Sequence, residues 1–327
     1  MAVDEAVQAV QEQLESIASQ KYAELEQKAD PKAATEELSE EMLKAQAACP
    51  DGWPTTHLVP SLPQWDPIPT ADFPCMYAGT LPSNADGSHQ LFYWMYPAAD
   101  FDNAPLAIWL NGGPGASSTF ANFLMNGPMR IEKTTDSGTG DADYRVYLAE
   151  QGSWVDAATM IFIDQPVGTG FSYGEPLLTT MDEAATEFVY FLDQIWNMYT
   201  AFPKKDLYMT GESYAGKYIP RFSVEILNTN ESLGEARYNL RASLVGDPYT
   251  APLTQRTHMY LVPQALNILD DSNMGQIATL NRRCQEILSS DMAAADETCG
   301  DIMGYIETVS GGVFPYDNRI FGYDWDP

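Results

Sequence analysis

The segment that most constrains the fold is Gly-Glu-Ser-Tyr-Ala-Gly at residues 211–216. It follows residues 206–210, which form a short predicted strand. A strand that turns sharply into a helix through small residues exposes the hydroxyl of its central serine at the top of a sheet. The segment therefore requires a strand, a tight turn and a helix in succession. It also makes Ser213 the first candidate for a nucleophile.

The chain around this segment shows the same alternation of strands and helices. Residues 84–87 supply turn residues between two predicted strands, which indicates a hairpin, and two short runs are wholly apolar, as in strands buried on both faces. We expect strands at residues 76–81, 90–96, 106–110, 160–163, 206–210 and 240–245, and helices at residues 181–201 and 217–227. This order is typical of an α/β fold with a mostly parallel central sheet and helices on both faces. Residues 264–306 have a helical, charged pattern.

The amino-terminal part of the chain has a different character. Apolar side chains recur there at three- and four-residue steps among Glu, Gln and Ala, which predicts an amphipathic helix, at Val3, Val7, Val10, Leu14 and Ile17. Asp30-Pro31 interrupts the pattern, and a second short helix is expected over residues 33–48. Residues 1–48 therefore form an acidic helical extension, either a pro-segment or docking helix or a loosely packed appendage. Residues 49–75 are rich in proline and predict an extended linker.

Charge and hydropathy exclude several classes of partner. The chain carries 46 acidic and 17 basic residues, a formal net charge of -29. Such a surface repels phosphate backbones and anionic headgroups, so neither nucleic acid nor a membrane surface is an expected partner. No run approaches the roughly 18–20 apolar residues of a membrane span. The first twenty residues lack the basic start and apolar centre of a secretory signal.

The four cysteines do not form a metal motif. None stands in a Cys-x-x-Cys pair, so neither a zinc knuckle nor a thioredoxin-type site is encoded, and we expect no metal or other cofactor. Cys284 and Cys299 flank a helical, loop-rich stretch and either form a local disulfide, which would imply an oxidising compartment, or remain as two thiols. Asn230-Glu-Ser232 is a single glycosylation sequon.

Three long motifs occur in this order along the chain: residues 108–118 (Ile-Trp-Leu-Asn-Gly-Gly-Pro-Gly-Ala-Ser-Ser), 161–173 (Ile-Phe-Ile-Asp-Gln-Pro-Val-Gly-Thr-Gly-Phe-Ser-Tyr) and 208–220 (Tyr-Met-Thr-Gly-Glu-Ser-Tyr-Ala-Gly-Lys-Tyr-Ile-Pro). Together they resemble the serine carboxypeptidases, α/β-hydrolases that remove C-terminal amino acids from peptides. The resemblance runs from Met76 to Pro252 and more loosely to the end. It implies an α/β-hydrolase core at 76–262, a helical cap insertion at 263–312 and a truncated return to the core at 313–327.

The resemblance also assigns roles to individual residues. Ser213 would be the catalytic nucleophile, and the backbone amides of Gly113 and Tyr214 would form the oxyanion hole. The substrate's C-terminal carboxylate would be held by Trp109, Asn111, Gly112 and Glu212. Paired glycines allow a turn whose amides point at a ligand, although a plain Gly-Pro turn has the same sequence. A protonated Glu212 donates a hydrogen bond to a carboxylate, whereas an ionised one repels it. The alternative for Glu212 is a polar residue that only flanks the turn, and residues 164–170 are expected to shape the pocket floor.

The chain departs from the family in three respects. Ala116 stands where the family usually has cysteine, and Met125 stands where it usually has a second carboxylate-binding Glu. Methionine cannot share a proton with a carboxylate. The third departure is the triad, which in α/β-hydrolases runs Ser, Asp, His along the chain. After Ser213 the chain offers Asp247 and His258, which match a different segment of the family.

We therefore expect the triad Asp and His outside this chain. If the last strands of the sheet are missing as well, one edge and one apolar face stay open. Such a chain would be a fragment, an incomplete gene model, or the larger chain of an enzyme cleaved in its cap and held to a second chain that completes the fold. A homodimer is a further alternative. The other two histidines, His57 and His89, precede the nucleophile in the linker and the hairpin turn.

The sequence thus predicts a serine carboxypeptidase that acts on peptide or protein substrates through an acyl-enzyme on Ser213. A related acyltransferase uses the same intermediate, and a catalytically inactive peptide-binding homologue would keep the pocket without the triad. By resemblance, the protein would be lysosomal, vacuolar or secreted.

Overall fold

The computed structural model describes residues 42–62, 73–133, 144–288, 290–291, 294–314 and 316–321. The chain divides into two compact units, Met1–Pro248 (unit 1) and Tyr249–Pro327 (unit 2). This division falls earlier in the chain than the core boundary expected at residue 262. The predicted helix over residues 3–17 and part of the predicted linker lie outside the described residues. Residues 42–47, within the second predicted helix, are helical.

Unit 1 is built on a six-stranded sheet with the order β1-β2-β6-β3-β7-β8. Its strands are β1 (Tyr77–Pro82), β2 (Gln90–Tyr96), β3 (Leu106–Leu110), β6 (Thr159–Asp164), β7 (Leu207–Glu212) and β8 (Leu240–Gly246). β6, β3, β7 and β8 run parallel, and β1 and β2 add an antiparallel hairpin at one side. The predicted strands and the mostly parallel sheet are confirmed. Every residue of β3 and β6 is buried, as their apolar runs indicate.

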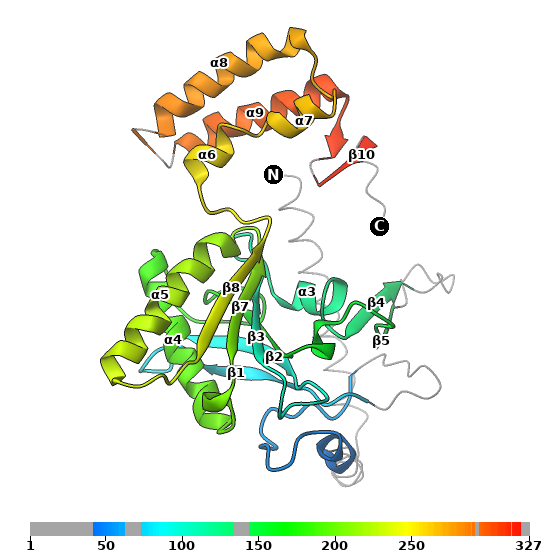
Figure 1. The fold of residues 1–327 in the computed structure, drawn as a ribbon, viewed down its shortest axis with the longest axis vertical. Helices are drawn as coiled ribbons and strands as arrows, with labels where there is room; N and C mark the ends of the chain where they lie inside the picture. Colours follow the sequence, from blue (N-terminus) through cyan, green and yellow to red (C-terminus); the bar gives the residue numbers. More distant parts are fainter. Residues whose placement is uncertain are drawn as a thin grey trace. The chain divides into compact units, whose positions relative to one another are not determined.

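Two long helices cover one face of this sheet (Figure 1). They are α4 (Met181–Met198) and α5 (Ala215–Leu233). α4 begins at a capping box in which Thr180 and Glu183 each bind the other's backbone N–H, and α5 ends at Gly234, whose φ of 68° suits glycine. Their apolar stripes pack on the side chains of Ile108, Met209 and neighbours.

The opposite face is covered by shorter elements (Figure 1). These are α3 (Thr119–Leu124), the ribbon formed by β4 (Met129–Lys133) and β5 (Tyr144–Leu148), and the 3-10 turn η1 (Trp154–Asp156). They bury Trp109, Phe162 and Met76 in a separate cluster. Neither α3 nor the β4–β5 ribbon was predicted from the sequence.

The residues before β1 pack against the main hydrophobic core of unit 1. A disulfide links Cys49 to Cys75, which the sequence did not predict. Trp53 packs at ring-centroid distances of 4.9–5.8 Å against an aromatic group that includes the 3-10 turn η2 (Phe202–Lys204), namely Tyr77, Phe101, Tyr199 and Phe202. Burial of these rings fixes the described part of the linker on unit 1.

β8 forms the other side of the sheet and is largely exposed. It pairs with β7, and no other described strand pairs with its second edge. Leu244 points to the face opposite α5 and is 51% exposed, although it is apolar. The sheet therefore ends in the described residues on an open edge, which proteins normally cover.

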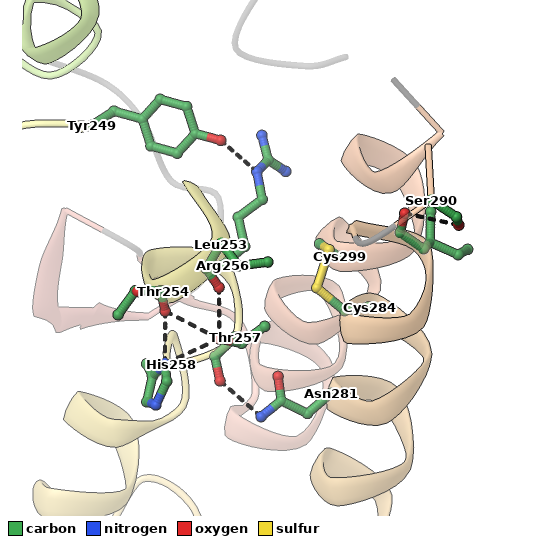
Figure 2. The surroundings of a disulfide bond; sticks show 11 residues. Tyr249, Leu253, Thr254, Arg256, Thr257, His258, Asn281, Cys284, Ser290 and Cys299 are labelled. Atoms are coloured by element: carbon green, nitrogen blue, oxygen red, sulfur yellow. Dashed lines mark hydrogen bonds between the residues drawn. A yellow bond between two sulfur atoms is a disulfide. The ribbon is translucent and has the colours of Figure 1, made fainter. Parts of the chain in front are cut away.

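Unit 2 is a small helical unit. It contains α6 (Pro252–Arg256), α7 (Leu261–Ala265), α8 (Asp271–Leu288), α9 (Ala295–Ser310) and a hairpin of β9 (Val313–Phe314) with β10 (Asp317–Phe321). A disulfide between Cys284 and Cys299 joins α8 to α9 at the buried seam of the pair (Figure 2). Of the two alternatives left open by the sequence, a local disulfide or two thiols, the structure has the disulfide. None of the described helices has both the length and the apolarity to cross a bilayer.

The side chain of Asn230, near the end of α5, binds the segment that connects this helix to β8. Its carboxamide accepts from the backbone N–H of Tyr238 at 3.0 Å and donates to the carbonyl of Tyr238 at 2.8 Å. The side chain of the predicted sequon is thus part of the fold, and it holds the chain as it turns back into the sheet.

We predict that Asn230→Ala lowers the free energy of unfolding by about 1–3 kcal/mol, because it leaves the Tyr238 backbone amide without an acceptor. Ser232→Ala is the matched control, since the Ser232 hydroxyl binds only the Thr229 carbonyl of its own helix, and a change within about 0.5 kcal/mol is expected. Urea unfolding followed by circular dichroism measures both. Each variant removes the sequon, so equal losses in the two would point to a glycan and contradict the structural role.

Candidate active site

Ser213 lies in the turn between β7 and α5, with a φ of 56° in the left-handed region. This conformation is unfavourable for a residue with a side chain and persists only where the surroundings hold it. The Ser213 N–H donates to the carbonyl of Gly246 at the end of β8 at 3.1 Å, and the Gly216 N–H donates to the Ser213 carbonyl at 2.9 Å. The strand, the helix and β8 together therefore fix the predicted exposed turn.

Small residues on both sides make the turn sterically feasible. A Cβ on Gly211 would lie 2.3 Å from the Leu110 carbonyl and 2.7 Å from the Ala215 Cβ. No side chain therefore fits at position 211, and the fully buried methyl group of Ala215 occupies the space beside it.

The loop after β3 passes directly beside the serine turn. β3 and β7 are parallel neighbours in which Leu110 is opposite Gly211, so the residues that follow the two strands meet. A Cβ on Gly112 would lie 2.4 Å from the Tyr214 backbone nitrogen and 2.7 Å from the Ser213 Cβ. Gly113 is exposed with a φ of 102°, and no described residue accepts a hydrogen bond from its N–H. The structure thus brings Gly112 and Gly113 together with Ser213 and Tyr214.

Asn111 is oriented by a buried hydrogen bond. The indole Nε1–H of Trp109 donates to its Oδ1 at 2.6 Å, and its own backbone N–H donates to the Ser118 Oγ at 3.1 Å. Because Oδ1 is an acceptor here, Nδ2 is left as a pair of donors. No described residue accepts from that Nδ2. Glu212 completes the group, since its Oε1 accepts from the Gly112 N–H at 3.4 Å.

Asp164 ties this loop to the loop after β6. Its carboxylate accepts from the Ser117 hydroxyl at 2.7 Å, from the Ser118 N–H at 2.8 Å and from the Phe171 N–H at 3.0 Å. A Cβ on Gly170 would lie 2.1 Å from the Asp164 Oδ2, so only glycine fits there. Burial raises the pKa of the Asp164 carboxyl above its usual value, against the opposing effect of these hydrogen bonds. The segment 164–170 therefore braces the site, which agrees with the structural role expected for it.

The positions that depart from the family lie near the same loops. Met125 caps the C-terminal end of α3 and brings no carboxylate to the site. Ala116 donates its N–H to the Gly112 carbonyl at 3.2 Å, and all four cysteines of the chain are paired elsewhere. Among the described residues, no group of three or more His, Cys, Asp or Glu side chains is arranged to hold a metal ion.

The three histidines of the chain are engaged in other contacts. His57 Nδ1 lies 3.0 Å from the Tyr93 hydroxyl, and His89 Nδ1 lies 2.6 Å from the Glu187 carboxylate. In unit 2, His258 Nδ1 lies 2.6 Å from the Thr254 carbonyl (Figure 2). No hydrogen bond joins the Ser213 Oγ to another side chain of the described part of the chain. The triad base expected elsewhere is therefore not replaced by His57 or His89.

Two residues that support the site, Ser118 and Trp154, were not predicted from the sequence. Ser118 connects β3 to β6, because its hydroxyl accepts from the Asn111 N–H and donates to the Ile163 carbonyl at 2.6 Å. The Ser117-Ser118 pair at the end of the first motif was its only sequence signal. Trp154 packs its ring edge to face against Trp109, with centroids 5.3 Å apart and planes at 89°. Nothing in the sequence around Trp154 indicated that contact.

We predict that Gly112→Ala destabilises the protein by about 3 kcal/mol or more, because the new methyl group overlaps the backbone of the serine turn. Gly246→Ala is the control at the neighbouring strand end. The nearest atom to its added Cβ is 4.0 Å away, so a change within about 1 kcal/mol is expected. Thermal and urea unfolding give both values. A Gly112→Ala protein as stable as the Gly246→Ala protein would show that the two loops do not touch.

We predict that Asp164 makes the protein more stable in acid than its neutral replacement Asp164→Asn. The folded-state pKa is raised, so the stabilising contribution of the protonated group is complete below the unfolded value of 3.8 and is lost as the pH rises through the higher folded value. The difference in unfolding free energy between the wild type and Asp164→Asn should therefore shrink from about pH 4 upward. Urea titrations at several pH values measure it. A difference that grows with pH would contradict the prediction.

Comparison with known proteins agrees with this geometry. The family model described as serine carboxypeptidase matches residues 68–321. A curated relative named serine carboxypeptidase S10 family member 2, from Dictyostelium discoideum, is 33% identical over 259 residues, covering 75% of this chain and 45% of the relative. The pheromone-processing carboxypeptidase KEX1 of Debaryomyces hansenii is 34% identical over 245 residues, covering 72% of this chain and 34% of that protein.

Among solved structures, a prohormone-processing carboxypeptidase from Saccharomyces cerevisiae, KEX1(delta)p, is similar with a TM-score of 0.63 and 29% identity. The match covers 72% of this chain and 53% of that one. The chain thus spans from about a third to about half of the length of these relatives. The family model covers well over half of the chain, and its match includes the serine turn, the glycine loop and Asp164. The chain therefore belongs to the serine carboxypeptidase family.

Proposed function

We propose that the protein is a serine carboxypeptidase that releases the last residue of peptides. The observation that carries the proposal is the contact of Gly112 with the left-handed Ser213 turn. This contact supports the proposal because it brings the loop that carries Asn111 against the Ser213 turn. A peptide whose C-terminal carboxylate occupies the hydrogen-bond donors of Asn111 has its last peptide bond within reach of the serine.

The carboxylate would be bound by the Asn111 Nδ2 and by Glu212. Asn111 presents its amide donors because its oxygen is held by Trp109. Glu212 donates to a second carboxylate only when its carboxyl carries a proton. Met125 takes the place of a second acid, so Glu212 is the one acid proposed to contact the substrate carboxylate.

In the reaction, a base removes the proton from the Ser213 Oγ as the oxygen bonds to the carbonyl carbon of the last peptide bond. The negative charge that develops on the carbonyl oxygen would be held by the N–H groups of Gly113 and Tyr214. When the C–N bond breaks, the leaving nitrogen takes up the proton and the free amino acid departs. Water then attacks the acyl-enzyme and restores the Ser213 hydroxyl.

We infer that the base and its aspartate reach Ser213 from a further polypeptide segment that extends the sheet at β8. The two histidines of unit 1 are engaged with Tyr93 and Glu187. The end of β8 binds the Ser213 turn through the Gly246 carbonyl, and the open edge of β8 lies next to it. A strand added parallel to β8 would therefore carry its following loop toward the serine, as the carboxyl ends of parallel strands share one side of a sheet.

Two disulfides support an oxidising compartment, so we propose that the protein acts in the secretory pathway, in a lysosome or vacuole, or outside the cell. A second candidate function is a peptide-binding homologue without catalysis. It is favoured by Met125 at the position of a carboxylate-binding acid and by the three engaged histidines.

A fluorophosphonate probe applied to the native protein purified from its source distinguishes the two functions. The enzyme should be labelled at Ser213, since the probe requires an activated hydroxyl. Labelling should vanish in Ser213→Ala and persist in Ser223→Ala, which removes a serine hydroxyl on α5 that bonds to Ser243. Absence of labelling on the folded wild type would contradict the enzyme and leave the peptide-binding homologue.

A further inference from the structure

Trp154 is held in place through its backbone. Its N–H donates to the Asn126 carbonyl at 2.9 Å, and its carbonyl accepts from the N–H groups of Ala157 and Ala158 at 3.0 Å. The turn of three residues that it begins, η1, leads straight into β6, the parallel neighbour of β3. Sheet pairing sets Thr159, at the start of β6, beside Leu106 at the start of β3, and the Trp154 ring reaches from there to Trp109.

The Asn126 turn that receives this hydrogen bond is itself rigid. The Arg130 guanidinium donates to the carbonyls of Gly127 at 2.8 Å and Met125 at 3.0 Å. A Cβ on Gly127 would lie 2.0 Å from the Asn122 carbonyl, so the turn packs tightly against α3. Trp154 is therefore anchored on one side by β6 and on the other by a braced turn.

The Trp154 ring continues this chain of contacts to the carboxylate site. It lies edge to face on Trp109, which is only 5% exposed, and Trp109 in turn holds the Asn111 oxygen. A rotation of the Trp109 ring would withdraw the indole N–H, and the Asn111 amide could then turn its oxygen toward an incoming carboxylate. An amide oxygen in that position repels the substrate that the Nδ2 donors would bind.

We propose that Trp154 is a positioning residue that selects substrates with a free C-terminal carboxylate by holding the Trp109 ring, and through it the Asn111 amide, in the donor orientation. The inference rests on the proposed function of this site. Trp154 touches no reacting atom, and its effect passes through two side chains. It should change the discrimination between a carboxylate and a neutral end group rather than binding in general.

The exposure of Trp154 separates this role from ordinary core packing. The residue is 42% exposed, so replacing it does not leave a sealed cavity. Its contribution to the site is the ring contact with Trp109, which phenylalanine retains in part and an aliphatic side chain loses. The fold should therefore tolerate the substitutions that test the proposal.

The test measures binding of N-benzoylglycyl-L-phenylalanine and of its C-terminal amide by calorimetry, in the native full-length protein carrying Ser213→Ala so that neither is cleaved. We expect this protein to bind the acid more tightly than the amide. Trp154→Leu should lower the ratio of the two affinities about tenfold with little change for the amide, which corresponds to the loss of one oriented hydrogen bond to a charged group. Trp154→Phe should retain most of the ratio.

Asn111→Ala provides the reference for complete loss of the contact, and Tyr190→Leu, on α4, is the matched substitution of an exposed aromatic residue. If Trp154→Leu does not fold, Trp154→Met, which also removes the aromatic edge, gives the same comparison. An unchanged ratio in the folded Leu or Met variant would overturn the role of Trp154 while the carboxylate site stands. Equal binding of acid and amide by the starting protein would overturn the carboxylate site, and the inference with it.

Discussion

The parallel pairing of β3 with β7 is the interaction on which the site depends. It sets Leu110 opposite Gly211, so the two loops that leave these strands emerge side by side at one end of the sheet. Gly112 can then press against the backbone of the Ser213 turn, at a distance that excludes any side chain. Residues about one hundred positions apart in the sequence become neighbours by this one register. A shift of one residue would turn every side chain of the strand to the other face.

Hydrogen bonds from the neighbouring strands β6 and β8 hold the loop after β3 and the Ser213 turn in place. β6 brings Asp164 to the backbone of Ser118, and Ser118 holds the Asn111 N–H, so the loop after β3 is fixed from its other side. β8 accepts the Ser213 N–H through Gly246. Each of the four parallel strands therefore contributes one contact to the site. The left-handed conformation of Ser213 costs about as much free energy as one hydrogen bond contributes. It is stable because these contacts act together.

The local parts of this arrangement were predictable from the sequence, and the non-local parts were not. The strand, turn and helix around Ser213 follow from residue size and periodicity, and the sequence separation of Cys284 and Cys299 allowed their pairing to be considered. The Cys49–Cys75 disulfide depends on how the chain before β1 folds back, which no local pattern encodes. α3 is only six residues long, and β4 and β5 form a separate ribbon with several exposed residues. None of these segments therefore shows a clear periodicity of apolar residues in the sequence. The contact of Trp154 with Trp109 arises from the alignment of β6 with β3.

This division between local and non-local contacts bears on how recognition and chemistry are distributed in the protein. The donors proposed for the substrate carboxylate lie at the carboxyl ends of β3 and β7, and the central strands β3 and β6 are wholly buried. The β8 side, where we propose that the base is added, is the exposed side of the same sheet. The groups proposed to hold the peptide are therefore fixed by contacts within unit 1, whereas the proposed base would come from a segment added at the exposed β8. Under this proposal substrate binding would need only the contacts within unit 1, whereas catalysis would also need the segment added at β8, so the two properties could be lost separately.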